Sequence, residues 1–291
     1  MRKLSDLISL IDKTSPKRLV VINAEDKETL EALEEAEEKN LINSILLGDK
    51  NKIKDIIKQN NLNINENKII QGDVDTALKL LKEDKADFIM KGNISTDDLM
   101  RDVLKGLDKK TLLSHVMVYE IPKYHKLLVL SDGGLITFPT LNQKIDIINN
   151  AIKLSKKLGV NLPKVAILSA TENVSEKINS TTDGALLSVM NRRGQIKGCI
   201  IEGPLALDNA ISKISANKKN INNEVSGDAD ILIVPNFEAG NLLGKAINYF
   251  GNGLSAGIIV GANFPIILNS RSSTKEEKLY SIMLGRISLN K

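Results

Sequence analysis

The chain has 291 residues, which at about 100–200 residues per domain is enough for two domains, each with its own hydrophobic core. Hydrophobic residues make up 42% and charged residues 26%, so the composition excludes intrinsically disordered and fibrous proteins. The formal net charge is only +4, and there are four tyrosines, five phenylalanines and no tryptophan to stack on bases. We therefore expect no nucleic-acid partner.

The single cysteine, Cys199, cannot form an intramolecular disulfide or a metal site built from several cysteines. Asp6 and Asp12 interrupt the first apolar stretch, and no small-residue cleavage site follows it, so the N-terminus does not resemble a signal peptide. No segment has the roughly 18–20 uninterrupted apolar residues that span a membrane. We expect a cytoplasmic protein with no membrane partner and no metal.

In the first 105 residues, short apolar runs alternate with longer amphipathic stretches, which is the rhythm of β-α-β units. The runs lack polar alternation, which is typical of strands buried on both faces in a parallel sheet covered by helices. The predicted elements are strands at 18–23, 43–48, 68–71 and 87–92, a helix at 73–84 and a helix that begins near residue 95.

The turn after the strand at 87–92 is polar and contains a glycine. Backbone N–H groups are exposed where a parallel strand leads into a helix, so such a turn can bind an anion. Lys91 and Gly92 stand where that anion would bind, and Ser95 or Thr96 can cap the helix, with Asp98 completing a capping box from Ser95. An ordinary capped helix explains these residues equally well.

The pattern changes at 114–131, where two β runs flank the residues PKYH and predict an antiparallel hairpin. The β-α rhythm then resumes, and the change of pattern near Gly133 and Gly134 marks the boundary between two lobes. A cleft between two such lobes is a common place for ligands. The later predicted elements are helices at 141–158 and 275–288 and strands at 164–170, 196–203, 229–235 and 256–262.

Three more polar turns follow predicted strands in the second half of the chain. One contains Asp208 and Asn209, which are more typical of helix caps than of catalysts, and the next contains Glu238 and Asn241. In the third, Arg271 directly follows an apolar run, where its two-pronged guanidinium can reach a phosphate.

Several other patterns do not hold up as motifs. The segment 240–245 is too short between its glycines for a P-loop, and no dinucleotide fingerprint opens the first β-α unit. Cys199 reads as a core residue, and His115 and His125 lack metal-ligand spacing and read as structural.

Six ordered segments together resemble the phosphate acetyl/butyryltransferase family over almost the whole chain, and more closely its butyryl branch. The segments are MKGNISTDDLMRDVL (90–104), LLSHVMVYEIP (112–122), PKVAILSATE (163–172), GQIKGCIIEGPLALDNAIS (194–212), ADILIVPNFEAGN (229–241) and PIILNSR (265–271). They are specific for the family but discriminate weakly among acyl groups, and the segment SDGGLITFPT departs from the family pattern.

The resemblance implies an α/β fold of two doubly wound lobes with a cleft between them, similar to isocitrate and isopropylmalate dehydrogenases. We place the first domain at 1–134 plus 268–291 and the second at 135–267. The implied reaction moves a short-chain acyl group, butyryl or branched C4–C5, between coenzyme A (CoA) and inorganic phosphate, through acyl phosphate. The resemblance further implies a homodimer, no metal and no prosthetic group, with CoA as a substrate.

Matched residue by residue, the resemblance assigns Ser270 to the CoA thiol and Arg271 to the phosphoryl group, with Arg101 as a second phosphate contact. Glu277 stands where the acetyl branch has an aspartate proposed as the base for the thiol. The remaining predicted phosphate or CoA contacts are Lys91, Gly92, Ser95, Thr96, Asn209, Glu238 and Asn241.

The chemistry fits direct transfer within a ternary complex. A thiol has a pKa of about 8.5, so a base or cationic surroundings raise its reactive fraction at neutral pH. Hydrogen-bond donors stabilise the oxyanion, and arginines offset the charge of the departing phosphate. The alternatives are a phosphate acetyltransferase, a catalytically silent acyl-CoA-binding protein and a nicotinamide-dependent dehydrogenase of similar fold.

Overall fold

The computed structural model describes residues 1–107 and 112–289, and the chain divides into two compact units. We call Ser5–Thr111 together with Ala256–Lys291 the terminal unit, and Met1–Leu4 together with Leu112–Ser255 the central unit. Each unit is a sheet flanked by helices, so the predicted α/β class is confirmed.

The terminal unit is built on strands in the order β3-β2-β1-β4-β11-β10. The first five are parallel, as predicted for the first 105 residues, and β10 pairs antiparallel with β11. The strands are β1 (Lys17–Ile22), β2 (Ile42–Leu47), β3 (Ile69–Ile70), β4 (Phe88–Lys91), β10 (Leu254–Val260) and β11 (Ile266–Ile267).

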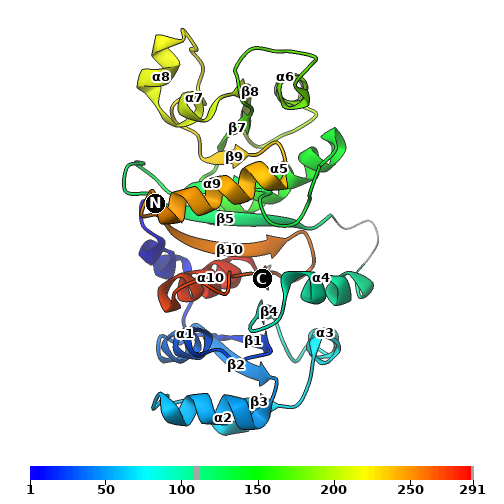
Figure 1. Ribbon diagram of the computed structural model, residues 1–291, viewed down its shortest axis with the longest axis vertical. Coiled ribbons are helices and arrows are strands. Elements are labelled where there is room, and N and C mark those ends of the chain that lie inside the picture. The colour runs from blue at the N-terminus through cyan, green and yellow to red at the C-terminus, as the bar shows by residue number, and fades with distance from the viewer. Residues whose placement is uncertain (108–111, 290–291) are drawn as a thin grey trace. The chain divides into compact units, whose positions relative to one another are not determined.

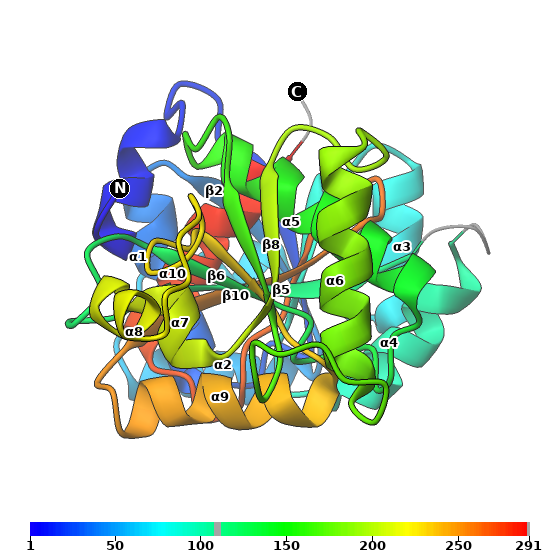
Figure 2. The ribbon, with the colours of Figure 1, turned by 90° about the horizontal axis from the view of Figure 1, so that it is seen from above.

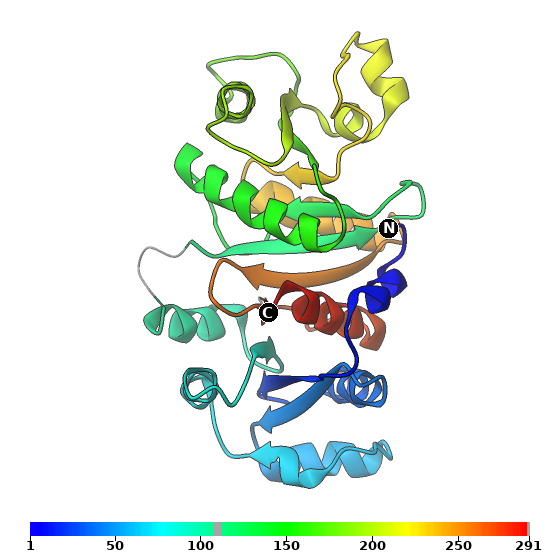
Figure 3. The same ribbon diagram turned by 180° about the vertical axis from the view of Figure 1, so that it is seen from behind.

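Helices cover the strands of the terminal unit. The last four residues of β1 are fully buried, as expected for a strand between two helix layers. The C-terminal helix packs against α1, and the two lie side by side in Figures 1 and 3. The helices are η1 (Leu4–Leu10), α1 (Lys27–Glu38), α2 (Lys50–Gln59), η2 (Glu66–Lys68), α3 (Val74–Lys82), α4 (Thr96–Lys105) and α10 (Lys275–Ser288).

The central unit has the strand order β5-β6-β9-β7-β8. Helices α5 and α9 cover opposite faces of β5, β6 and β9 (Figures 1 and 3), and α6 runs beside β8 (Figure 2). The strands are β5 (Ser114–Glu120), β6 (Leu128–Ser131), β7 (Lys164–Leu168), β8 (Ile200–Leu205) and β9 (Ile231–Ile233). The helices are α5 (Leu141–Lys157), α6 (Asn179–Arg192), α7 (Leu207–Ile211), α8 (Lys213–Lys218) and α9 (Phe237–Tyr249).

The predicted hairpin is present, but it belongs to the central unit. Strands β5 and β6 pair antiparallel, and β6 also pairs with β9, so the segment 114–131 packs with later strands rather than earlier ones. The units therefore divide near 112 and 255, whereas we placed the boundaries at 134, from the change of sequence pattern, and at 268, from the family resemblance. Strand β9 follows β6 by about 100 residues in the sequence, so the residues around 114–131 carry no local signal of this pairing.

Candidate active site

Three neighbouring strands of the terminal unit bring the polar turns of the sequence to one edge. Ile22 of β1 pairs with Lys91 of β4, and Met90 of β4 pairs with Ile267 of β11. The carboxyl ends of β1, β4 and β11 therefore meet, and the residues that follow them share that edge. In α/β sheets this is where ligands bind.

Lys91 is a buried cation at this edge, with only 6% of its surface exposed. Among the described residues its side chain has no hydrogen-bond or ion-pair partner. Burial lowers the pKa of Lys91, and the positive charges of Arg271 and Lys278 lower it further, while the Asp26 carboxylate acts in the opposite direction. An unpaired buried charge is costly, so this arrangement favours binding of an anion.

Gly92 is required by the close approach of β1. A Cβ atom at this position would lie 2.2 Å from the carbonyl oxygen of Asn23. The N–H of Gly92 donates to the carbonyl of Ile22 at 2.9 Å, and that of Asn93 to the carbonyl of Asn23 at 2.6 Å. Both N–H groups therefore already donate to backbone carbonyls, so Gly92 has no free N–H to offer the predicted anion.

Ser95 caps α4, as predicted. Its hydroxyl accepts from the N–H of Asp98 at 3.0 Å and donates to the Asp98 carboxylate at 2.6 Å, while Thr96 is the first residue of the helix. Arg101 lies on the exposed side of α4 and pairs with Asp98 at 2.5 Å. Ser95 and Arg101 therefore form part of a capped surface helix, and the alternative interpretation of an ordinary capped helix accounts for their contacts.

Ser270 and Arg271 follow β11 and are exposed, so both are accessible to a substrate. The Ser270 hydroxyl lies 3.0 Å from that of Ser272. Arg271 follows β11, the strand that pairs with β4, and its charge acts on Lys91, so these two predicted residues share the carboxyl edge of the sheet.

Glu277 is buried in the first turn of α10, where it forms a capping box with Thr274. Its carboxylate accepts from the N–H of Thr274 at 3.1 Å, and its own N–H donates to the Thr274 hydroxyl at 3.2 Å. The structure thus gives Glu277 a local role in addition to the predicted one.

Two residues of this edge were missed by sequence reasoning. Asp26 caps α1 by accepting from the N–H of Thr29 at 2.9 Å, and it also binds the ammonium of Lys278, which is buried on α10. Burial by itself would raise the pKa of Asp26, but bonds from Lys278 and Thr29 outweigh it and lower the pKa. An N-cap aspartate is visible in the sequence, but its pairing with a lysine 252 residues later is not.

The other predicted contacts lie in the central unit. Asn209 on α7 is fully buried and donates to Glu172 at 3.1 Å, which makes it part of the packing. Glu238 is exposed in the first turn of α9, and Asn241, one turn later, donates to the carbonyl of Gly133 at 3.4 Å. The Asn209 side chain is thus buried away from the surface, whereas Glu238 is exposed to solvent.

A buried histidine and aspartate stand beside the double-glycine turn of the central unit. Burial lowers the pKa of His115 to about 4, and neither ring nitrogen has a hydrogen-bond partner. Burial raises the pKa of Asp132 to about 6, although it accepts from the N–H groups of His115, Gly134 and Leu135. The structural role predicted for His115 fits this burial.

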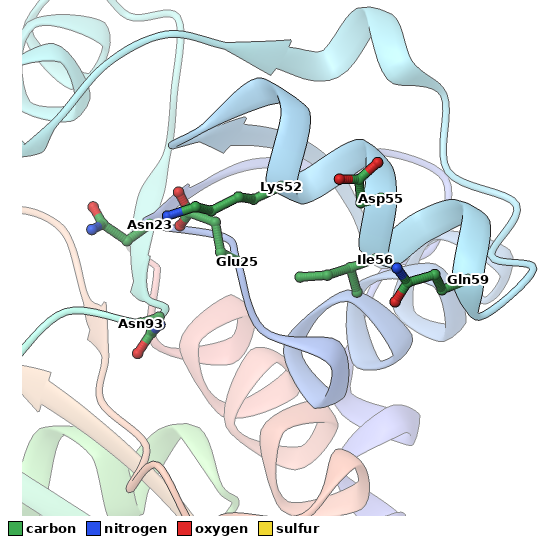
Figure 4. Close-up of a pocket in the computed structure, with 7 residues that line it drawn as sticks. All are labelled: Asn23, Glu25, Lys52, Asp55, Ile56, Gln59 and Asn93. Atoms are coloured by element: carbon green, nitrogen blue, oxygen red, sulfur yellow. The ribbon is translucent and has the colours of Figure 1, made fainter.

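A pocket of about 440 Å³ opens in the terminal unit beside the end of β1 (Figure 4). In Figure 4 the ammonium end of Lys52 lies beside the carboxylate of Glu25. With two carboxylates and one lysine, the pocket does not favour an anion such as phosphate. Its lining residues are Asn23, Glu25, Lys52, Asp55, Ile56, Gln59 and Asn93.

The described residues include neither a metal-binding cluster nor a helix that could span a membrane. Within 1–107 and 112–289, no group of three or more histidine, cysteine, aspartate or glutamate side chains could hold a metal ion. Over the same residues, no helix is both long enough and apolar enough to cross a bilayer.

Comparison with known proteins places these residues in context. Residues 65–285 match the family described as Phosphate acetyl/butaryl transferase. The chain is 38% identical to a phosphate butyryltransferase of Clostridium beijerinckii, covering 98% of this chain and 97% of the relative. It is 39% identical to a phosphate acetyltransferase of Thermotoga maritima, covering 93% and 95%. A branched-chain phosphotransacylase structure from Enterococcus faecalis superimposes with a TM-score of 0.79 at 28% identity, covering 94% and 98%.

Proposed function

Because the chain belongs to the phosphate acetyl/butyryltransferase family, we propose that it is the member that moves a C4 or branched C4–C5 acyl group between CoA and inorganic phosphate. The coarser class is a phosphate acyltransferase, an enzyme class that all of the relatives named above share. The observation that carries the proposal is the ammonium of Lys91, unpaired among the described residues and borne by a buried residue, on the strand next to the one that Arg271 follows.

Lys91 and Arg271 are the proposed phosphate ligands. The planar fork of Arg271 matches two phosphate oxygens, whereas Lys91 supplies a point charge at the end of a rigid strand. Phosphate leaves the acyl group carrying about two negative charges, and these cations offset them. Arg101 remains a possible further contact in this scheme only if it leaves Asp98, with which it pairs on the surface of α4.

The proposed reaction has no covalent enzyme intermediate. The CoA thiol gives its proton to a base, and the thiolate sulfur attacks the carbonyl carbon of the acyl phosphate. A C–S bond forms, an oxyanion develops on the carbonyl oxygen, and the C–O bond to phosphate then breaks with its electron pair remaining on the phosphate. The Ser270 hydroxyl donates to the thiolate or the oxyanion, where a preorganised donor accelerates acyl transfer.

Glu277 is the proposed base for the thiol. It lies in the first turn of α10, into which the Ser270–Arg271 segment leads directly, and its capping bond fixes the carboxylate in place. The neighbouring cations also favour the thiolate over the thiol, since an opposite charge stabilises the ionised form. Glu238 and Asn241 at the start of α9 remain proposed contacts for the CoA chain.

The protein is proposed to act as a cytoplasmic homodimer without a prosthetic group. The apolar hairpin at 114–131 offers no dimer surface, because β5 and β6 are largely buried within the central unit. Support comes instead from α9, which exposes 68% of Leu242 and 69% of Tyr249, followed by Phe250 at 90%. Exposed apolar patches of this kind mark interaction surfaces.

A panel of acyl-CoAs from C2 to C6 tests the proposal. Release of the CoA thiol in the presence of phosphate should give the highest kcat/KM for a C4 or branched C4–C5 group. Each methylene in an apolar pocket is worth about 1–3 kcal/mol, so the preference should be graded. Acetyl-CoA with the highest kcat/KM would contradict the acyl assignment, and no phosphate-dependent release with any member would contradict the reaction itself.

A further inference from the structure

The cations at the carboxyl edge of the terminal unit are accompanied by one carboxylate. Asp26 follows β1, Lys91 ends β4 and Arg271 follows β11, three strands that are adjacent in the sheet. Lys278 reaches this edge from α10, where its side chain is 4% exposed and bonded to Asp26, which is 25% exposed. The charges of Asp26, Lys278 and Arg271 all act on Lys91.

The four residues differ in how far their charges are satisfied. Asp26 and Lys278 form a direct ion pair, whereas Lys91 and Arg271 have no ion pair among the described residues. The cluster as a whole therefore carries three positive charges and one negative charge. Because Asp26 is the carboxylate that acts on Lys91, it opposes every anion that approaches that lysine.

We propose that Asp26 and Lys278 are positioning residues of the phosphate site. Asp26 balances part of the positive charge of the site when no phosphate is bound, and Lys278 holds that carboxylate in place. This inference rests on the proposed function, since it assigns the anion at Lys91 to phosphate. Without phosphate, the Asp26 carboxylate compensates one of the three positive charges of the cluster. Because it also repels a bound phosphate, it limits the affinity of the site for phosphate. An enzyme that must release phosphate in one direction benefits from such a limit.

The two members of the pair should affect phosphate in opposite directions. Asp26→Asn removes the opposing charge but retains a side chain that caps helices well, so the KM for phosphate should fall about tenfold. Lys278→Gln leaves the Asp26 charge uncompensated beside Lys91, so the KM for phosphate should rise about tenfold. In the double variant the changes should cancel, which returns the KM to within about threefold of the wild-type value.

Acyl-CoA provides the internal reference for these variants. Its KM should change less than about threefold in each of them, since the altered charges face the phosphate. Asp73→Asn is a matched control, because Asp73 also caps a helix, α3, but pairs with no lysine in the described part of the chain. Lys144→Gln is a second control, because Lys144 forms an equally buried pair with Asp183 in the central unit.

Both controls should leave the KM for phosphate unchanged, and thermal melts should confirm that all variants fold. A purely structural role of the pair would raise the KM in both single variants, and more in the double variant, and that result would overturn the inference. If Asp26→Asn does not fold, Lys278→Gln decides alone: an unchanged KM for phosphate would overturn the inference, and a selective rise would support it.

Calorimetric titration with inorganic phosphate separates this inference from the proposed function. If the wild-type protein transfers no acyl group, yet Asp26→Asn binds phosphate more tightly and Lys278→Gln more weakly, the proposed reaction fails and the inference stands. If acyl transfer is present but phosphate affinity does not move in opposite directions, the inference fails and the reaction stands.

Discussion

Three buried lysines in the described part of the chain differ in their partners, and this difference marks the site. Lys144 binds Asp183 at 2.7 Å and Lys278 binds Asp26, but Lys91 has no carboxylate of its own. Removing one partner of a buried ion pair is strongly destabilising, because an uncompensated charge remains. Lys91 retains such a charge, which the proposed phosphate would compensate.

At the residue scale, Ser270 and Arg271 should fail in different ways. Arg271→Ala removes a charge-assisted, two-pronged contact worth about 1.5–3 kcal/mol, so the KM for phosphate or acyl phosphate should rise roughly ten- to a hundredfold. Arg271→Lys should rescue poorly, since it lacks the planar fork. Ser270→Ala should instead lower kcat by about a hundredfold with little change in KM. Steady-state kinetics on folded variants distinguish the two, and near-normal activity in both would place the site elsewhere.

His115 and Asp132 should give the central unit two opposing pH dependences. The folded chain retains the Asp132 proton up to about pH 6, whereas the ordinary pKa is 3.8, so stability from this group is lost as pH rises through about 6. His115 stays neutral down to about pH 4, whereas its ordinary pKa is 6.5, so stability is lost as pH falls through this range. Between about pH 4 and 6 the two contributions oppose each other.

Single substitutions should separate these contributions. In His115→Gln only the contribution of Asp132 to stability remains, so the melting temperature should fall as pH rises from about 4.5 to 6.5. In Asp132→Asn only the contribution of His115 to stability remains, so the melting temperature should rise over the same interval. The melting temperature of the wild-type protein should depend on pH less than that of either variant. Calorimetric melts at several pH values measure the slopes, and identical slopes in all three proteins would contradict this account.

At the scale of single elements, helix starts were the most readable features of the chain. Ser95, Thr140 and Thr274 each cap a helix through a side-chain bond to the third helical residue. Close packing of elements was less readable. Gly240 of α9 lies against Gly133, where a Cβ atom would be 2.6 Å from the Gly133 Cα, and nothing in either local sequence indicates this contact.

The capping boxes of α5 and α10 allow a matched comparison. Thr140→Ala and Thr274→Ala each remove a cap and should cost about 1 kcal/mol of stability. Only in Thr274→Ala does the weakened first turn carry the proposed base: the Glu277 N–H loses its acceptor, although the Glu277 carboxylate keeps its bond from the backbone N–H of residue 274. This variant should therefore in addition lower kcat about tenfold, because misplaced catalytic groups are costly. Denaturant melts and kcat measurements test both effects. An equal loss of kcat in the two variants would contradict a catalytic role for Glu277.

At the scale of the whole molecule, the apolar surface of α9 should be covered by a second copy. Light scattering should give about twice the chain mass of 31.9 kDa at micromolar concentration. Replacing Leu242 and Phe250 together by serine should weaken the dimer by roughly a hundredfold or more, since each apolar side chain that becomes buried contributes about 1.5–3 kcal/mol. Phe138→Ser, at a residue that is 70% exposed outside α9, serves as the control. A concentration-independent monomer would refute the dimer.

The sequence by itself determined those features that depend on neighbouring residues. Apolar runs without alternation marked the buried parallel strands, Ser95 marked the start of a helix, and Arg271 was recognised directly after its strand. These signals are local because strand burial, capping and turns involve residues only a few positions apart. The ordered motifs likewise identified the family that the comparisons show.

Only the tertiary structure decided which distant groups share an edge. It joined Lys278 to Asp26 across 252 residues, left Lys91 buried with no partner among the described residues, and placed the hairpin with β9 rather than with the first strands. Whether a charged side chain is paired, buried or exposed depends on contacts between segments far apart in the chain. The one-dimensional pattern of residues carries no record of those contacts, so it could name Arg271 and Lys91 but not the Asp26–Lys278 pair at the same edge.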